Sequence, residues 1–288
     1  MSQVRTVIAF TSDRSGIGQS MAVASIALML AANGRRVLAI DWDFAKPSLV
    51  NYFIPFVPAD ALEGNNGMID ARWSYGIEAR RAPPAHISDL QRRFLAVSPI
   101  ECAIRDELCL HNGGALHLLP AGREPQRSLR ERYFSWGEFF DRLDGESLLA
   151  TLWKELQRRY DHILIDCPQG PRVSNAARFP ILRAGILVAC STLDRESMKA
   201  GAALARWASA LLPDRRLLIC PLACGLGRML RLSYYVMRVR IVCVCFNSST
   251  RVLCFQWTPM FAARWRFRKY RSSHTDGFCP LCLGFLKW

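Results

Sequence analysis

The chain has 288 residues, of which 51% are hydrophobic, and its formal net charge is +14. This length allows one large α/β domain with a full-sized core, and the composition of the first three quarters excludes intrinsic disorder. No uncharged apolar run reaches the roughly 18 residues of a membrane-spanning helix, so we expect no transmembrane segment. The short apolar stretch at residues 6–10 fits a strand better than a secretory signal, and we expect a cytoplasmic protein.

The basic charge is concentrated in the C-terminal quarter. Residues 221–288 contain 11 Lys or Arg and one acidic residue, whereas residues 1–220 contain 27 basic and 23 acidic residues. Six of the 11 cysteines also lie after residue 220. This change of composition predicts one domain over residues 1–221, followed by a basic, cysteine-rich segment over residues 222–288.

The first 43 residues indicate an alternation of strand and helix. Residues 4–12 are β-branched and apolar, which is typical of a buried strand. Residues 20–32 carry apolar side chains at helical spacing, and Gly34 follows as a helix stop. Residues 36–43 form a second apolar run that ends in acidic residues. A strand, a helix and a strand in this order predict an α/β fold, with a mostly parallel sheet and helices on both faces.

The rest of the chain gives a less even pattern. Proline and glycine interrupt residues 52–114, which predicts short helices and loops there. After about residue 225 no period of two or 3.6 is visible, so no recognisable fold is predicted for the C-terminal segment. Between these parts, strands are expected at 115–119, 162–166, 184–190 and 217–220, and helices at 136–143, 146–159 and 194–211.

A glycine-containing stretch joins the first strand to the first helix. It reads Phe-Thr-Ser-Asp-Arg-Ser-Gly-Ile-Gly-Gln-Ser-Met over residues 10–21. Glycines let backbone N–H groups close around phosphate oxygens at the start of the following helix. Ser20, at the end of the stretch, is suited to ligating Mg²⁺. The pattern alone also fits an ordinary strand-to-helix turn.

Acidic residues end two of the predicted strands. Asp41 and Asp43 end the second strand, and Asp166 ends the strand at 162–166. Ligands of open parallel sheets lie at the carboxyl ends of the strands, so these groups and the glycine loop should face one crevice. Each aspartate alone fits a helix cap or a turn. Together they favour a site for Mg²⁺ bound to nucleotide phosphates.

With these motifs in this order, residues 4–220 resemble the ParA/MinD/CobQ ATPases, whose deviant Walker A loop reads KGGVGK followed by Ser or Thr. The likeness is closest to the variant subgroup with a KGGVGR loop, and it extends to residues 37–53, 116–123 and 160–166. It implies a P-loop NTPase fold of the SIMIBI type that binds ATP and Mg²⁺. It also implies a nucleotide-dependent homodimer and a protein or DNA cargo that the sequence does not identify.

The resemblance implies a role for each matching residue. Ser20 matches the Mg²⁺-binding hydroxyl, and Asp166 matches the Walker B carboxylate that holds the metal through water. Asp43 matches the carboxylate that orients the attacking water, with Asp41 as its companion near the metal. Arg14 stands at the signature lysine, which reaches the partner's nucleotide in a dimer, and is expected to be catalytic with Asp43. The phosphate-binding residues are Arg14, Ser15, Gly16, Ile17, Gly18, Gln19, Ser20 and Met21.

Two positions depart from the family loop. Ser15 replaces a glycine and would strain the loop if that position needs a positive φ. Gln19 replaces the in-loop Lys or Arg, so it cannot make a charge-assisted hydrogen bond worth roughly 1.5–3 kcal/mol. We therefore expect weakened nucleotide binding and hydrolysis. The alternative is a degenerate module that binds nucleotide or protein without hydrolysis, and a weaker third option is a truncated product with no independent role.

The C-terminal segment allows several interpretations. The spacing of its cysteines is unusual for a zinc site. Its basic, aromatic stretch at 264–271 matches no nucleic-acid-binding module, although its charge alone favours non-specific binding of nucleic acid. Our hypothesis is that the reading frame shifted near residue 222, which would leave a non-native ending and an exposed sheet edge. Translation of the other two frames tests it. The candidate zinc ligands are Cys243, Cys245, His274, Cys279 and Cys282.

Overall fold

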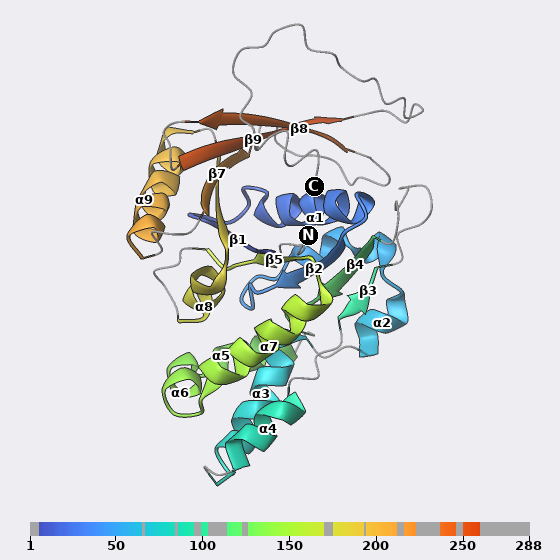
Figure 1. Cartoon of the computed structure of the whole chain (residues 1–288), viewed down its shortest axis with the longest axis vertical. Coiled ribbons are helices and arrows are strands. Elements are labelled where there is room, and N and C mark those ends of the chain that lie inside the picture. Colours follow the sequence, from blue (N-terminus) through green and yellow to red (C-terminus); the bar gives the residue numbers. More distant parts are fainter. Residues whose placement is uncertain are drawn as a thin grey trace, which may run out of the picture.

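The computed structural model describes residues 6–64, 67–83, 86–94, 99–102, 114–122, 126–169, 175–192, 194–211, 216–222, 237–245 and 250–259. Over these residues, nine strands form one sheet in the order β3-β4-β2-β5-β1-β6-β7-β9-β8 (Figure 1). Helices cover both of its faces. The predicted α/β class is therefore confirmed.

The middle of the sheet is parallel throughout. The first strand, β1 (Thr6–Ser12), lies between β5 (His162–Asp166) and β6 (Ile186–Thr192). On the other side of β5 lies β2 (Arg36–Asp41), which also pairs with β4 (Ala115–Leu119). Parallel strands covered on both faces are expected to be almost continuously apolar, as these are. Their carboxyl ends consequently lie at one edge of the sheet.

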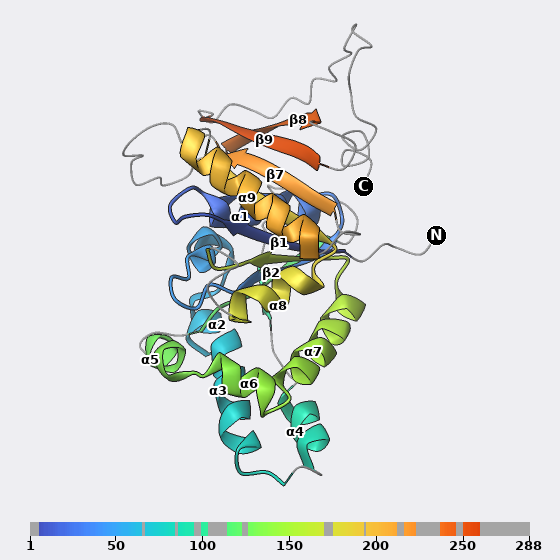
Figure 2. The same ribbon diagram turned by 90° about the vertical axis from the view of Figure 1, so that its left-hand side faces the viewer.

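The outer strands include the part of the chain for which the sequence predicted no fold. At one end, β3 (Ile100–Glu101) is antiparallel to β4. At the other end β7 (Arg216–Leu222) is parallel to β6, and β9 (Thr250–Pro259) is parallel to β7. The outermost strand at this end of the sheet, β8 (Met237–Cys245), is antiparallel to β9 (Figures 1 and 2). A sheet edge offers backbone N–H and C=O groups to any extended segment, so pairing there does not require a side-chain pattern.

Each central strand contributes alternate residues to two separate cores. Val7 and Ala9 belong to the core under α7 (Gly145–Arg159) and α8 (Asn175–Arg183). Ile8 and Phe10 belong to the core under α1 (Gln19–Ala32). The helix α9 (Arg195–Leu211) lies on the same side as α7, because its Trp207 packs against the first core. The glycine loop is thus at the end of a strand that is covered on both faces.

Short helices make up most of the remaining described residues, as expected for 52–114. Figure 2 shows α3 to α6 together at the end of the molecule far from β8 and β9, with α7 at one side of them. The helices α5 and α8 and the two-residue β3 were not predicted, and β2 ends at Asp41 rather than at residue 43. The short helices are η1 (Leu49–Tyr52), η2 (Ile54–Phe56), α2 (Ala59–Gly64), α3 (Met68–Ala79), α4 (Ile87–Phe94), α5 (Gln126–Tyr133) and α6 (Trp136–Asp141).

Among the helices that the structure describes, none combines the length and the apolar character needed to span a bilayer. Residues 264–271, His274, Cys279 and Cys282 lie outside the described residues, as do residues 4, 5 and 123 of the predicted motifs.

Candidate functional site

Strand register places two of the predicted carboxylates side by side. Asp166 is aligned with Phe10 of β1 on one side and with Asp41 of β2 on the other. Neighbouring strands lie about 4.8 Å apart, so the ends of three strands converge on Asp166. The glycine loop continues from β1 at this edge, and Asp43 follows β2 there. The loop and the three aspartates therefore meet at one edge of the sheet.

Two glycines give the loop its turn. Gly16 has φ 78° and Gly18 has φ 91°, both in the left-handed region that other residues avoid. Gly18 comes directly before α1, and its carbonyl accepts a hydrogen bond from the Ala22 N–H at 2.9 Å. A Cβ at Gly18 would lie 3.3 Å from Cε of Met21, so this position is also crowded. Ser15 is not among the described non-glycine residues with positive φ, so the expected strain at this serine is absent.

The side chain of Gln19 points into the sheet edge. Its Nε2 donates to Asp166 Oδ1 at 2.6 Å, to the Cys167 carbonyl at 2.7 Å and to the Phe10 carbonyl at 3.3 Å. Its Oε1 is buried and has no hydrogen-bond partner in the part of the chain that the structure describes. A neutral amide thus connects the end of the loop to the carboxylate of β5. Sequence reasoning marked Gln19 only for its missing charge and did not find this contact.

Ser20 also contacts Asp166, and its hydroxyl lies 2.6 Å from the hydroxyl of Ser48. Burial raises the pKa of Asp166 to about 6, although hydrogen bonds from Ser20 and Gln19 act in the opposite direction. Burial and the nearby Asp166 charge raise the pKa of Asp41 well above its ordinary value. The site is therefore an environment in which two adjacent carboxylates resist full ionisation.

The two acidic residues after β2 have different environments. Asp41 is 1% exposed, and its carboxylate accepts the N–H of Asp43 at 3.2 Å and that of Leu49 at 3.1 Å. Asp43 is only partly buried, and its Oδ1 accepts the Lys46 N–H at 2.9 Å. Asp41 thus holds the segment 43–49 in place, and Asp43 is the more accessible carboxylate. The resemblance gave the two aspartates different roles, but the difference in their burial was not predicted.

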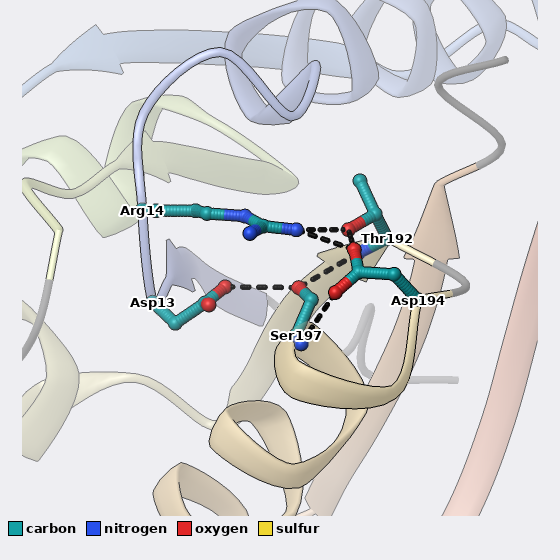
Figure 3. A network of polar contacts seen from close by, with 5 residues as sticks. All are labelled: Asp13, Arg14, Thr192, Asp194 and Ser197. Carbon is teal, nitrogen blue, oxygen red and sulfur yellow. Dashed lines mark hydrogen bonds and ion pairs between the residues drawn. The ribbon is translucent and has the colours of Figure 1, made fainter.

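The side chain of Arg14 points away from the three aspartates, toward the start of α9. Its guanidinium donates to Oγ1 of Thr192 at 2.8 Å and forms an ion pair with Asp194, at the junction of β6 and α9 (Figure 3). Neither partner was predicted as a site residue. The only signal in the sequence is the position of Asp194 at the start of the helix predicted at 194–211, which indicates a cap and not an ion pair.

Within the described residues, no group of three or more His, Cys, Asp or Glu side chains is arranged to hold a metal ion. The side chains of Cys243 and Cys245, in β8, are not described, so the zinc interpretation is untested.

Comparison with known proteins gives one curated relative and several solved structures. No protein-family model matches the chain. The succinoglycan biosynthesis transport protein ExoP of Rhizobium meliloti (strain 1021) is 28% identical over 181 residues, which is 63% of this chain. The match covers only 18% of that relative.

The solved structures have lower identities. A plasmid partition protein from Borrelia burgdorferi is 18% identical, with a TM-score of 0.43 over 75% of this chain and 78% of its own. MinD from Aquifex aeolicus is 18% identical, with a TM-score of 0.42 over 75% and 68%. Cobyrinic acid a,c-diamide synthase from Mycobacterium smegmatis, with bound ATP analog and magnesium, is 18% identical, with a TM-score of 0.46 over 75% of each chain.

These similar structures are ParA/MinD/CobQ-type P-loop ATPases. This is the family that the motifs of residues 4–220 resemble. The closer likeness to the KGGVGR subgroup stays a prediction.

Proposed function

We propose that the chain is a MgATP-binding switch of the ParA/MinD type, with weakened nucleotide binding and hydrolysis. One observation carries the proposal. The glycine loop before α1, with its two positive-φ glycines, lies at the carboxyl ends of the strands together with Ser20, Asp43 and Asp166. A nucleotide site needs a backbone cradle for phosphates and oxygen ligands for Mg²⁺ at the same place. This edge of the sheet supplies both.

The loop suits a phosphate for two reasons. It ends at the N-terminus of the 14-residue helix α1, where the helix dipole and the N–H groups of a first turn favour an anion. The first turn of α1 contains no acidic residue that would repel one. Arg14 is the only cationic side chain in residues 10–21 and would reduce the charge of the γ-phosphate. Ile17 is 4% exposed, which fixes the middle of the loop against the core.

The residues present also fit Mg²⁺. The ion prefers oxygen ligands and commonly binds through one or two carboxylates together with phosphates and water. Ser20 supplies a hydroxyl and Asp166 a carboxylate, and the aligned Asp41 is held by hydrogen bonds from the N–H groups of Asp43 and Leu49. A divalent cation would favour the ionised form of Asp166 and so reverse the effect of burial on its pKa. When bound, Mg²⁺ would neutralise charge on the phosphates, while Asp43 would orient the attacking water.

Gln19 is the reason to expect weak activity. Its amide cannot supply the charge-assisted hydrogen bond that a lysine makes to phosphate, a difference of roughly 1.5–3 kcal/mol, or about ten- to a hundredfold in affinity. We therefore expect Gln19→Lys to tighten MgATP binding by at least tenfold and to raise phosphate release.

The experiment compares MgATP binding and phosphate release in the unmodified chain, Gln19→Lys and Asp43→Ala. Asp43→Ala should bind ATP but release no phosphate. Asp89→Ala, which removes an exposed carboxylate from α4, is the control and should match the unmodified chain. Equal turnover in Asp43→Ala and the unmodified chain would contradict the role of Asp43. Absence of binding in every folded variant would contradict the proposal as a whole.

A second candidate function is a module that holds nucleotide or a protein partner without turnover. It is favoured by the Gln19 amide, which already occupies Asp166 Oδ1. Binding without phosphate release in the unmodified chain would support it. A nucleotide-dependent homodimer, a protein or DNA cargo and a cytoplasmic location are further proposals. A DNA cargo is of interest because one similar structure is pNOB8 ParA bound to nonspecific DNA.

A further inference from the structure

A polar network joins the glycine loop to the start of α9 (Figure 3). Arg14 donates to Oγ1 of Thr192 at 2.8 Å and pairs with Asp194, and the Thr192 hydroxyl donates to the same carboxylate. Ser197 Oγ donates to Asp13 Oδ1 at 3.1 Å and accepts the Thr192 N–H at 3.0 Å. Both loop residues, Asp13 and Arg14, therefore have partners at the β6–α9 junction.

The contact follows from the sheet topology. Ser12 of β1 is aligned with Cys190 of β6, so the segments that follow the two strands emerge side by side. Asp194 uses its two oxygens differently. Oδ1 accepts the Ser197 N–H at 3.0 Å and so caps α9, while Oδ2 faces Arg14 and Thr192. One carboxylate thus connects the helix to the loop.

Arg14 is able to exchange its partner Asp194 for a phosphate. The two side chains are 49% and 46% exposed, and exposed ion pairs are weak. Phosphate, in contrast, can accept two parallel hydrogen bonds from a guanidinium. A hydrogen bond from Thr192 is the main cause that lowers the pKa of Asp194 to about 2, so the carboxylate is ionised at neutral pH.

We infer that Asp194 is a latch for Arg14: it holds the loop cation when no nucleotide is bound and gives it up to a nucleotide phosphate. Asp194 continues to cap α9 after the exchange, because the cap uses its other oxygen. The β6–α9 junction thereby responds to the presence of phosphate in the loop. This inference rests on the proposed nucleotide site and adds a means of regulation to it.

The test uses Asp194→Asn in the full chain. Asparagine caps helices about as well as aspartate, so the substitution removes the charge and keeps the cap. MgATP affinity is measured by calorimetry at low salt, and we expect binding about two- to fivefold tighter than in the unmodified chain, as the loss of a weak exposed pair predicts. In an Arg14→Ala background, Asp194→Asn should change the affinity little.

The matched control is Glu196→Gln. It removes the same charge from the first turn of α9, but Glu196 pairs with Lys199 and not with Arg14. We expect no gain in affinity. Hydrogen exchange in the absence of nucleotide supplies a second readout, in which the amides of residues 13–18 should exchange faster in Asp194→Asn than in the unmodified chain.

A gain that requires Arg14, together with faster exchange of the loop, would support the latch. An unchanged affinity in Asp194→Asn, or the same gain in Glu196→Gln or without Arg14, would overturn the latch and leave the nucleotide site intact. Failure of all folded variants to bind MgATP would overturn the proposed function and the exchange with it.

Discussion

At the scale of single residues, burial and hydrogen bonding determine the ionisation of the aspartates at the carboxyl ends of β2 and β5. Asp166 is 2% exposed, and the aligned Asp41 is 1% exposed. Such burial penalises a carboxylate unless a cation or enough hydrogen bonds compensate it. Gln19 and Ser20 supply hydrogen bonds but no charge. Without a metal ion, ionisation of both carboxylates is therefore less favourable here than it would be beside an in-loop lysine.

The first prediction concerns the pH dependence of stability through Asp166. Its pKa of about 6 in the folded chain exceeds the ordinary value of 3.8, so ionisation destabilises the fold as pH rises through this range. Asp166→Asn removes the titration while retaining an acceptor for Gln19. Without Mg²⁺ or nucleotide, the variant should become more stable relative to the unmodified chain as pH rises from 4 to 7, by an amount on the order of 2 kcal/mol.

Urea unfolding at several pH values measures this difference. Asp89→Asn, an exposed substitution on α4, is the control and should follow the pH dependence of the unmodified chain. A difference between Asp166→Asn and the unmodified chain that stays constant from pH 4 to 7 would show that Asp166 does not titrate in this range.

A second prediction concerns Arg72, which is 2% exposed and whose guanidinium nitrogens have no hydrogen-bond partner among the described residues. The guanidinium lies 4.0 Å from the ring centroid of Trp42 and 4.5 Å from that of Phe44, and burial lowers its pKa well below the ordinary value. Cation–π contacts contribute about 2 kcal/mol when desolvated, and a buried unpaired charge costs at least as much. Arg72→Met should therefore leave the unfolding free energy within about 1 kcal/mol or raise it.

Arg72→Ala serves as the comparison, because it removes the charge and also leaves a cavity between the aromatic rings. It should lower the unfolding free energy by about 2–4 kcal/mol. Chemical denaturation of both variants measures the two values. Equal losses in Met and Ala variants would mean that the positive charge itself stabilises this cluster.

At the scale of elements, the glycine loop depends on backbone conformation more than on its side chains. The third prediction is that Gly18→Ala destabilises the chain by about 1–3 kcal/mol, because its φ of 91° is costly for alanine and the added Cβ approaches Met21. It should also weaken MgATP binding if the loop holds phosphate.

Gly137→Ala is the matched control. Gly137 lies in α6 without positive φ, and an added Cβ would meet nothing closer than 3.9 Å. Alanine is the better helix former, so this variant should be stabilised by up to about 1 kcal/mol. Thermal unfolding compares the two, and an equal effect of both substitutions would contradict the assigned strain at Gly18.

At the scale of the whole molecule, β9 and β8 are the last two strands at one end of the sheet, next to β7. The β7 edge pairs with β9 in parallel, and β8 covers the far edge of β9. A chain that ends at Leu222 would present the unpaired backbone of β7 to solvent. Exposed edges of this kind pair with other chains.

The fourth prediction is that a chain ending at residue 222 self-associates more than one ending at residue 259. Light scattering at increasing protein concentration measures the difference. Equal behaviour of the two chains would show that the β8–β9 hairpin does not protect the edge. A hairpin that protects the edge contributes to the fold whether or not the reading frame shifted near residue 222.

The fold of the first 220 residues was largely predictable because its signals are local. The strands at 115–119 and 162–166 coincide with β4 and β5, and α1 begins one residue before the prediction. Buried parallel strands are continuous apolar runs, and their pattern is visible without knowledge of their neighbours. The hairpin of β8 and β9 was not predictable, because its residues show no period and its position depends on the edge of β7.

The sequence by itself determined the α/β class, the glycine loop and the acidic strand ends. Each depends on residue types and spacings within about 40 positions of chain. Only the tertiary structure decided that Gln19 bonds Asp166, 147 positions away, and that Arg14 pairs with Asp194, 180 positions away. The reason is that strand order, and not distance along the chain, sets which segments emerge together at the sheet edge. Tertiary structure likewise decided the surroundings of Arg72, whose aromatic neighbours Trp42, Phe44 and Trp136 come from two other segments of the chain.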